Sequence, residues 1–200
     1  FFYLLDCLFT ERRDRSILFW KSLPVSDAKT VMSKLFVALV AMPLWIWALS
    51  LVVGLVVFGV LAVKVSGTPA AALGTWHGED WLALQATLLG EILVAVLWYL
   101  PMVGWLLLVS SLAKRAPLVW ATLPFLVVSI AERTALGTRH VAELLERRLD
   151  GWANHFSLGG LELSNAQFTL LTSAELWLGV LVGAALVYAA IRVRQRSDDS

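Results

Sequence analysis

The 200-residue chain carries few of the side chains from which an active site is usually built. Its single cysteine, Cys7, excludes a disulfide framework and any multi-cysteine metal site. Its three histidines, His77, His140 and His155, are far apart and fall in segments that we expect to be external loops. No G-x-x-x-x-G-K-[ST], G-x-S-x-G, H-E-x-x-H or C-x-x-C motif is present. We therefore expect no catalytic residue, no metal site and no nucleotide-binding loop in this chain.

Two carboxylates, Glu91 and Glu175, stand inside long apolar stretches, where a charge is costly and often functional. They are the candidates for a translocation path, because they can face each other across a polar cavity. Alternatively, they can pair with Arg133 near the outer mouth of such a path. A third interpretation, slightly favoured, places each carboxylate close enough to the membrane interface to stay hydrated.

The composition explains why so few polar groups are available. Hydrophobic residues make up 59% of the chain and charged residues 16%, and the mean hydropathy is +0.77. A soluble domain is roughly 45–50% apolar and about 25% charged, so a soluble core of this length cannot hide so much apolar sequence. The ten tryptophans agree, because Trp gathers at membrane–water interfaces. The net charge of +1 excludes the strongly basic surface of a nucleic-acid-binding protein.

Four long apolar stretches predict membrane-spanning helices, since about 20 apolar residues are needed to cross a bilayer. The predicted fold class is an all-α, polytopic helix bundle that forms one transmembrane domain over residues 1–200. Pro101 and Gly104 indicate a local break in the second stretch, such as a short re-entrant piece before a true span. Residues 1–9 have the composition of the end of a fifth span. The predicted spans are residues 35–65, 81–113, 117–131 and 168–191, with a cytoplasmic segment at 10–34 and an external loop at 132–167.

Basic residues flank these spans unevenly, and their distribution predicts the orientation. Residues 11–34 hold six Lys or Arg against three Asp or Glu, which gives this segment a net charge of +3. The link at 114–115 is Lys-Arg, and residues 192–196 include three arginines. If the spans alternate, all three groups lie on one side, which we expect to be the cytoplasm and to hold the C-terminus. The basic residues within 132–167 count against this orientation.

Two patterns indicate how helices pack around the spans. Apolar residues recur at helical spacing over residues 132–150, and Glu143 and Arg147 form a favourable i,i+4 pair. This stretch predicts either an external interfacial helix that caps the bundle or a solvated loop helix with no specific role. Gly179 and Gly183 form a G-x-x-x-G in the fourth span, which predicts a close-packing face for another helix.

The cytoplasmic segment 10–34, TERRDRSILFWKSLPVSDAKTVMSK, is the most informative part of the chain. Its first part predicts a short basic and aromatic helix that stops at Leu23, because a residue before proline avoids the α region. Ser26 then caps a new helix, with Asp27 in its first turn. This helix runs into the first span at Leu35. On the residues alone, an anchor that only fixes topology explains the segment as well as a specific role does.

The stretch RRDRSILFWKSLPVSDAKTVMSK resembles a segment of the permease subunits of bacterial ABC-2 type exporters. In that family D-R-S-x-L-F-W-K-S-L-P-V-S-D joins the second and third spans. The later LWYLPMVGWLLLVSSLAKRAPLVWATLP is similar to the family's L-P-x-V-G-W-L-L-L-x-S segment, which precedes a basic pair and a Trp-bearing span. Together the two matches cover about a quarter of the chain. The family's N-terminal amphipathic helix and first span are absent, so the resemblance implies an N-terminally truncated six-span permease.

The resemblance further implies a bacterial inner-membrane exporter with a second permease subunit, identical or different, and two ATPase subunits. ATP and magnesium would bind to the ATPases, and this chain would hold no cofactor. Cytoplasmic loops of such permeases sit as coupling helices in grooves on the ATPases and convert ATP binding into alternating access of the spans. The resemblance leaves the substrate open. It places the ATPase-coupling residues at Arg12, Arg13, Arg15, Phe19, Trp20 and Lys21.

Two other functions fit the same architecture. One is a non-transporting scaffold or force-transmitting subunit of an ABC-type complex, which needs no continuous cavity. The other is an ion-coupled transporter in which Glu91 and Glu175 carry protons, and it needs these carboxylates to be buried and close together. An exporter, by contrast, needs Phe19 and Trp20 to contact another protein.

Overall fold

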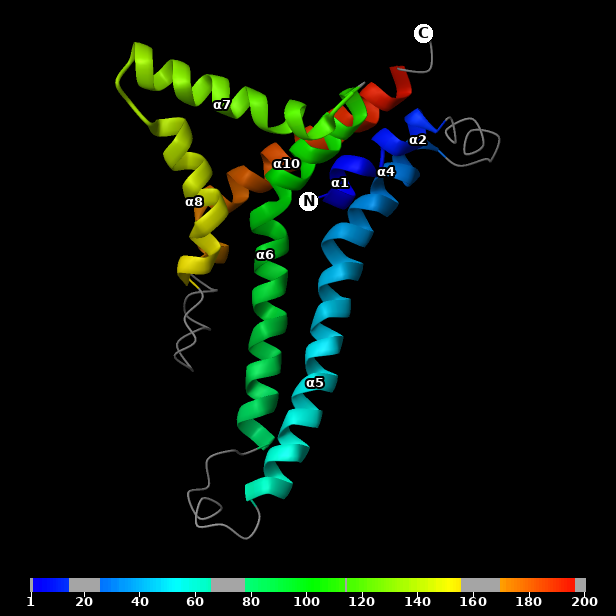
Figure 1. Cartoon of the computed structure of the whole chain (residues 1–200), viewed down its shortest axis with the longest axis vertical. Helices are drawn as coiled ribbons and strands as arrows, with labels where there is room; N and C mark the ends of the chain where they lie inside the picture. Colours follow the sequence, from blue (N-terminus) through cyan, green and yellow to red (C-terminus); the bar gives the residue numbers. More distant parts are fainter. Residues whose placement is uncertain (1, 15–25, 66–77, 114, 156–169, 197–200) are drawn as a thin grey trace.

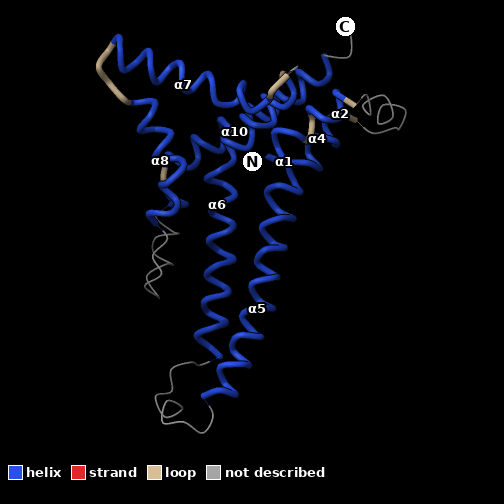
Figure 2. The backbone as a smooth tube through the Cα atoms, in the orientation of Figure 1, coloured by secondary structure: helices blue, strands red, loops and turns tan. Residues whose placement is uncertain are grey.

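The computed structural model describes residues 2–14, 26–65, 78–113, 115–155 and 170–196. Within these ranges the chain is helical and contains no strand, as predicted. Figures 1 and 2 show the path of the helices. In chain order they are α1 (Phe2–Asp6), α2 (Phe9–Arg13), α4 (Asp27–Phe36), the π-helical turn η1 (Val37–Ala41), α5 (Met42–Val65), α6 (Gly78–Leu112), α7 (Pro117–Ala135), α8 (His140–His155) and α10 (Ala174–Arg196).

Four helices of the described chain are long and apolar enough to cross a membrane, which confirms a multi-pass membrane protein by length and composition. The first begins at Asp27 rather than at residue 35, because α4, η1 and α5 form one continuous helix. Residues 2–13, in contrast, form two five-residue helices separated by a turn. The four candidate spans are Asp27–Lys64, Trp81–Leu112, Pro117–Ala135 and Ala174–Arg196.

The start of the first long helix follows the prediction. Ser26 is its N-cap, and the side-chain oxygen accepts a hydrogen bond from the backbone N–H of Lys29 at 3.4 Å. Asp27 lies in the first turn. Farther along, the helix widens into η1 just before Pro43, whose nitrogen has no hydrogen to donate. Proline and single π-helical turns are both recognised places where a helix bends without ending.

The predicted break in the second span is wrong. α6 is continuous from Gly78 to Leu112 and includes Pro101 in its interior. Proline removes one helical hydrogen bond, but a helix in an apolar environment tolerates this when a neighbouring helix supports the site. Here the neighbour is α10, whose Gly183 lies directly against Leu100 and Pro101.

The helices form a long hairpin with a group of helices at one end (Figure 1). α5 and α6 make the hairpin, and α10 crosses α6 and reaches α4 with its C-terminal end. α7 leaves the end of α6 at a wide angle to the hairpin, and α8 returns from the outer end of α7 towards α6 and α10. α1, α2, the start of α4 and the end of α10 lie together at one end of the molecule.

Two groups of buried side chains hold this arrangement together. The larger group lies where α1, α4, α6, α7 and α10 meet, and the smaller one joins the middle of α6 to the start of α10. The outer faces of α5 and α7 are apolar and exposed, as expected of surfaces that contact lipid. The residues of the larger group are Leu4, Leu5, Leu8, Val31, Val103, Leu106, Leu107, Val109, Ala113, Ala121, Val187 and Ala190.

The stretch predicted as one surface helix over residues 132–150 is divided between two helices, so that prediction is wrong at its start. α7 continues to Ala135, and α8 begins at His140 after a turn in which Gly137 has a φ of +66°. Glu132 ends up as the cap of the following helix. Its carboxylate accepts hydrogen bonds from the backbone N–H groups of His140 at 2.7 Å and Val141 at 2.9 Å. These are N–H groups that a helix start leaves without intrahelical partners.

Candidate functional site

A compact group of four charged side chains joins both flanks of segment 10–34 to α10. Arg194 of α10 contacts Glu11 of α2 at 2.9 Å through Nη1 and Asp27 of α4 at 2.8 Å through Nε. Lys34 of α4 contacts the other oxygen of Glu11 at 2.7 Å. We call these four residues the ionic junction. It ties three helices together at the end of the molecule where both ends of segment 10–34 are found.

The ionic junction is shielded from solvent, and this makes it strong. The Arg194 side chain is only 5% exposed, and those of the other three residues of the junction are 13–22% exposed. Two positive and two negative groups balance each other there. Charges in such a place attract more strongly than at a surface, because water and salt screen them less. Removal of one partner would leave an uncompensated charge in a poorly solvated place, which is strongly unfavourable.

A serine on α6 fixes the other side of α2. Ser110 is fully buried, and its hydroxyl donates a hydrogen bond to the carbonyl of Leu5 at 2.8 Å. The same oxygen accepts from the backbone N–H groups of Leu8 and Phe9, each at 3.2 Å. It therefore satisfies backbone groups that the break between α1 and α2 leaves without helical partners. α2 is held by α6 on one side and by the ionic junction on the other.

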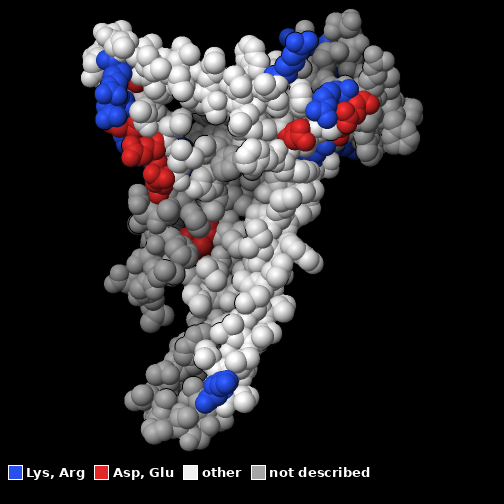
Figure 3. All heavy atoms as spheres, viewed as in Figure 1, with Lys and Arg blue, Asp and Glu red and all other residues white. Residues whose placement is uncertain are grey.

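The predicted coupling residues lie either in α2, next to the ionic junction, or outside the described residues. Arg13 is exposed at the end of α2 and contacts Asp14 at 3.3 Å. Arg12 also belongs to α2, but its side chain lies outside the described part of the structure. Figure 3 shows side chains of both signs gathered around this end of the chain. Arg15, Phe19, Trp20 and Lys21 all lie outside the described residues.

The ionic junction could not be predicted from the sequence. Three of its residues were considered only as charges that flank the predicted spans, and Asp27 also as a residue in the first turn of a helix. Arg194 and Glu11 are separated by 183 positions, so no local pattern relates them. The sequence offers one relevant signal, which is that basic residues lie before the first span and after the last one. This signal predicts that the two segments lie on the same side of the membrane, but it does not predict which residues form ion pairs.

The two glycines predicted as a packing face are both buried where α10 meets its neighbours. A Cβ atom on Gly183 would lie 2.7 Å from the carbonyl carbon of Leu100 and 2.8 Å from the nitrogen of Pro101. In return, a Cβ on Gly104 would lie 2.7 Å from the carbonyl oxygen of Gly183. The two backbones thus touch, as small residues allow in membrane helix pairs. A Cβ on Gly179 would instead collide with the guanidinium of Arg148 in α8.

Arg148 docks α8 against α6 and α10. Its guanidinium lies 4.4 Å from the ring centre of Trp98 and donates to the backbone carbonyl of Glu175 at 2.8 Å. Trp98 in turn donates its indole N–H to the carbonyl of Arg148 at 3.0 Å, and Tyr99 donates to that of Leu149 at 3.0 Å. Burial lowers the pKa of Arg148, while the nearby carboxylate of Glu175 acts in the opposite direction. These contacts make α8 an integral part of the bundle.

A largely apolar cavity of about 1010 Å³ lies between α6, α7, α8 and α10. Trp105 of α6 and Phe125 of α7 meet edge to face in its wall, with ring centres 5.3 Å apart. The indole N–H of Trp105 also donates to the carbonyl of Ala121 at 3.1 Å, which ties α7 to α6. Pockets of this size and character commonly hold apolar ligands.

The two candidate translocation carboxylates occupy different places. Glu91 of α6 is only 3% exposed, and it is not part of the cavity wall. Glu175 is exposed in the first turn of α10 and does line the cavity. The arginine beside Glu175 is Arg148, whereas Arg133 is exposed near the end of α7. No group of three His, Cys, Asp or Glu side chains suited to a metal ion occurs among the described residues.

No protein-family model matches the chain, and no similar protein was found among curated proteins or solved structures. A function for this chain is therefore inferred from its own residues and from the contacts that the fold makes between them.

Proposed function

We propose that the chain is the membrane-spanning permease subunit of an ATP-driven ABC exporter of the bacterial inner membrane. ATP and magnesium bind in this proposal to separate ATPase subunits, and a second permease subunit completes the transporter. The supporting observation is the ionic junction, which fastens both flanks of the segment that resembles a coupling helix to α10.

The contacts of the junction supply a route for mechanical coupling. A displacement of the coupling segment reaches α10 through Glu11 and Asp27, because both carboxylates hold Arg194. α10 packs backbone to backbone on α6 at Gly183, so α6 must follow. Packed helices joined in this way move as rigid bodies, as alternating access requires. The chain contributes no chemical step of its own.

The orientation in this proposal puts the ionic junction on the cytoplasmic side. The segment at 10–34 has a net charge of +3, and the tail at 192–196 adds three arginines. The junction joins these two basic stretches directly, so both belong to the same side of the membrane. Basic residues beside spans favour the cytoplasmic side.

The proposal is tested by co-purification with the ABC ATPase encoded nearest to the gene for this chain. In a Phe19→Ala/Trp20→Ala variant we expect loss of ATPase capture and of ATPase stimulation, because buried aromatic residues carry much of an interface's binding energy. The matched control is Phe36→Ala/Trp45→Ala, which removes the same side-chain types from exposed positions on α4 and α5. Equal capture by all three proteins would overturn the coupling assignment.

An ion-coupled transporter is the second candidate. The burial of Glu91 is the observation that favours it, whereas Glu175 is exposed and so does not meet the requirement that both carboxylates be buried. In that mechanism Glu91 and Glu175 exchange protons, so both must titrate during transport. A Glu91→Gln/Glu175→Gln variant would then lose transport even with ATPase capture intact. Normal transport by that variant would remove the proton-relay mechanism and leave the ATP-driven one.

A further inference from the structure

The polar part of the cavity between α6, α7, α8 and α10 has an excess of negative charge. Three carboxylates line it, those of Glu146 and Asp150 on α8 and Glu175 on α10. Among the described residues, none of the three forms a salt bridge. Figure 3 shows acidic side chains along α8. The single basic residue in the described wall is Arg148.

Arg148 offsets only part of this excess. Its positive charge attracts the carboxylate of Glu175, and its guanidinium is already held by neutral groups. One nitrogen donates to the carbonyl of Glu175, another lies 3.4 Å from the carbonyl of Trp98, and the whole group stacks on the Trp98 ring. Its side chain is also lodged against Gly179. An incoming anion would have to compete for this arginine while it was repelled by three carboxylates.

The rest of the wall is apolar and aromatic. Trp105 and Phe125 form one side of it, and apolar side chains of α6, α7, α8 and α10 form most of the remainder. An apolar body therefore gains by entering the cavity, and aromatic rings also attract a cation placed over their faces. The carboxylates are exposed, so a cationic group beside them keeps part of its hydration and avoids the full cost of burial.

We propose that this cavity binds a hydrophobic organic cation, a molecule with a bulky apolar body and one positive charge. As the cargo class of an exporter, this rests on the proposed function above; as a binding site, it rests on the cavity alone. A neutral acyl chain would contact the apolar wall of the cavity but would make no favourable electrostatic interaction with the three carboxylates. An anionic amphiphile would meet them with like charge.

The test compares two ions of nearly the same size and shape and opposite charge, tetraphenylphosphonium and tetraphenylborate. Wild-type protein is placed in phosphatidylcholine nanodiscs without ATPase or nucleotide, and binding to empty discs is subtracted. We expect saturable binding of the phosphonium at least about tenfold tighter than binding of the borate, a difference of about 1.4 kcal/mol. Equal or tighter binding of the borate, or no saturable phosphonium binding to monodisperse protein, would overturn the proposal.

Two pairs of variants locate the site. Asp150→Asn/Glu175→Gln is expected to weaken phosphonium binding about tenfold, whereas Glu143→Gln, which removes a carboxylate from α8 outside the cavity wall, changes it little. Val182→Trp projects a larger side chain into the cavity and is expected to weaken saturable binding, whereas Leu181→Trp, at a position outside the cavity wall, changes it little. Equal effects within either pair would place the bound ion elsewhere and contradict the assignment.

These experiments test the binding site separately from the proposed function. They contain no ATPase, so loss of phosphonium binding leaves the ATPase partnership standing. Loss of ATPase partnership, in turn, leaves the binding site standing and removes only its assignment as cargo site.

Discussion

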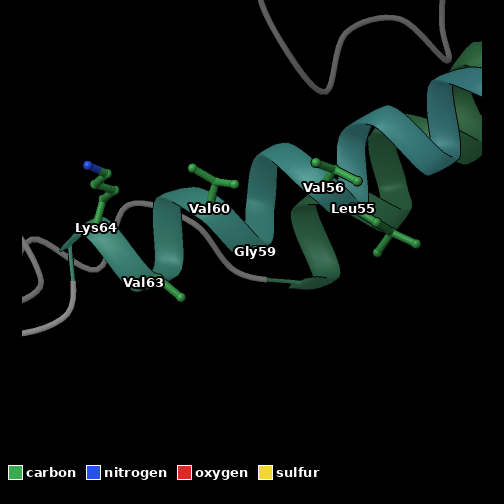
Figure 4. A pocket seen from close by; sticks show the side chains of 6 residues that line it. All are labelled: Leu55, Val56, Gly59, Val60, Val63 and Lys64. Carbon is green, nitrogen blue, oxygen red and sulfur yellow. The ribbon is translucent and has the colours of Figure 1, made fainter.

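The crossing of α10 over α6 and the outer helix α5 are made of similarly apolar sequence, yet they are positioned in different ways. At the crossing, Gly183 brings the two backbones into contact, and Arg194 locks the end of α10 to α2 and α4. α5 has no buried residue in its most apolar stretch. Figure 4 shows the row from Leu55 to Lys64 along α5, where nothing lies within 4 Å of a Cβ placed on Gly59.

α5 is nevertheless attached to α6, through the packing of Trp81 against Gly54 and through a small polar contact. The indole N–H of Trp47 donates to the carbonyl of Gln85 at 3.1 Å, and the hydroxyl of Ser50 lies 3.3 Å from the side-chain oxygen of the same residue. Between helices in lipid there is no hydrophobic driving force, so close packing and hydrogen bonds determine the neighbours. Hydropathy places both helices in the membrane, whereas small and polar residues determine which helix lies against which.

The largest effect should come from the ionic junction. Arg194→Met is expected to lower the free energy of unfolding by about 3–5 kcal/mol, because Glu11 and Asp27 lose a shared, shielded partner. The measurement is unfolding by sodium dodecyl sulfate in mixed micelles. The control is Arg192→Met on the same helix, where the arginine is exposed and bonded to Tyr188, and we expect a change of at most about 0.5 kcal/mol. Equal losses in the two variants would contradict the structural role of the junction.

A smaller loss is expected at the helix crossing. Gly183→Ala places a methyl group 2.7–2.8 Å from backbone atoms of Leu100 and Pro101, so the helices must separate. Overpacking of this kind costs about 1–3 kcal/mol. The matched change on α5, Gly59→Ala, meets open space and should stay within about 0.5 kcal/mol of wild type. The same unfolding assay checks both, and a Gly59 variant as unstable as the Gly183 variant would remove the contrast between the two regions.

The smallest effect should come from the contact that holds α5. Ser50→Ala removes a hydroxyl that lies 3.3 Å from the side-chain oxygen of Gln85 and also donates to the carbonyl of Trp47 in its own helix at 2.7 Å. The bond donated by Trp47 to Gln85 stays in place, so we expect a loss of about 0.6 kcal/mol, the average for such bonds between membrane helices. Ser33→Ala serves as the control, since that hydroxyl bonds only within its own helix, to the carbonyl of Thr30. A loss of several kcal/mol at Ser50 would mean that α5 is positioned as firmly as α10.

Much of the fold could be predicted because its signals are local. The length and hydropathy of four helices follow from composition, and the cap at Ser26 follows from a residue type beside a helix start. The continuity of α6 through Pro101 was missed because the local cost of proline is offset by α10, a helix some 80 positions away in sequence. Glu132 was placed at the start of a helix rather than as its cap because the turn at Gly137 was not recognised.

The candidate sites divide in the same way. The coupling role was inferred from a family resemblance of segment 10–34, and most of the side chains assigned to it lie outside the described structure, so that assignment stays a prediction. Glu175 was singled out as a charge in an apolar stretch, and the structure places it in a cavity wall. The other two carboxylates of that wall, Glu146 and Asp150, were not singled out because surface charges on an amphipathic helix are ordinary.

The sequence by itself determined that this chain enters the membrane several times and that its positive charge gathers beside particular spans. Both properties follow from the hydropathy and charge of the residues in each segment. These quantities decide directly whether a segment enters a bilayer and how it is oriented there. Only the tertiary structure decided that Arg194 meets Glu11 and Asp27, that Gly183 meets Pro101, and that four helices enclose an apolar cavity with an acidic wall. These contacts join residues that are far apart in the chain, and such residues meet only when the helices pack against one another.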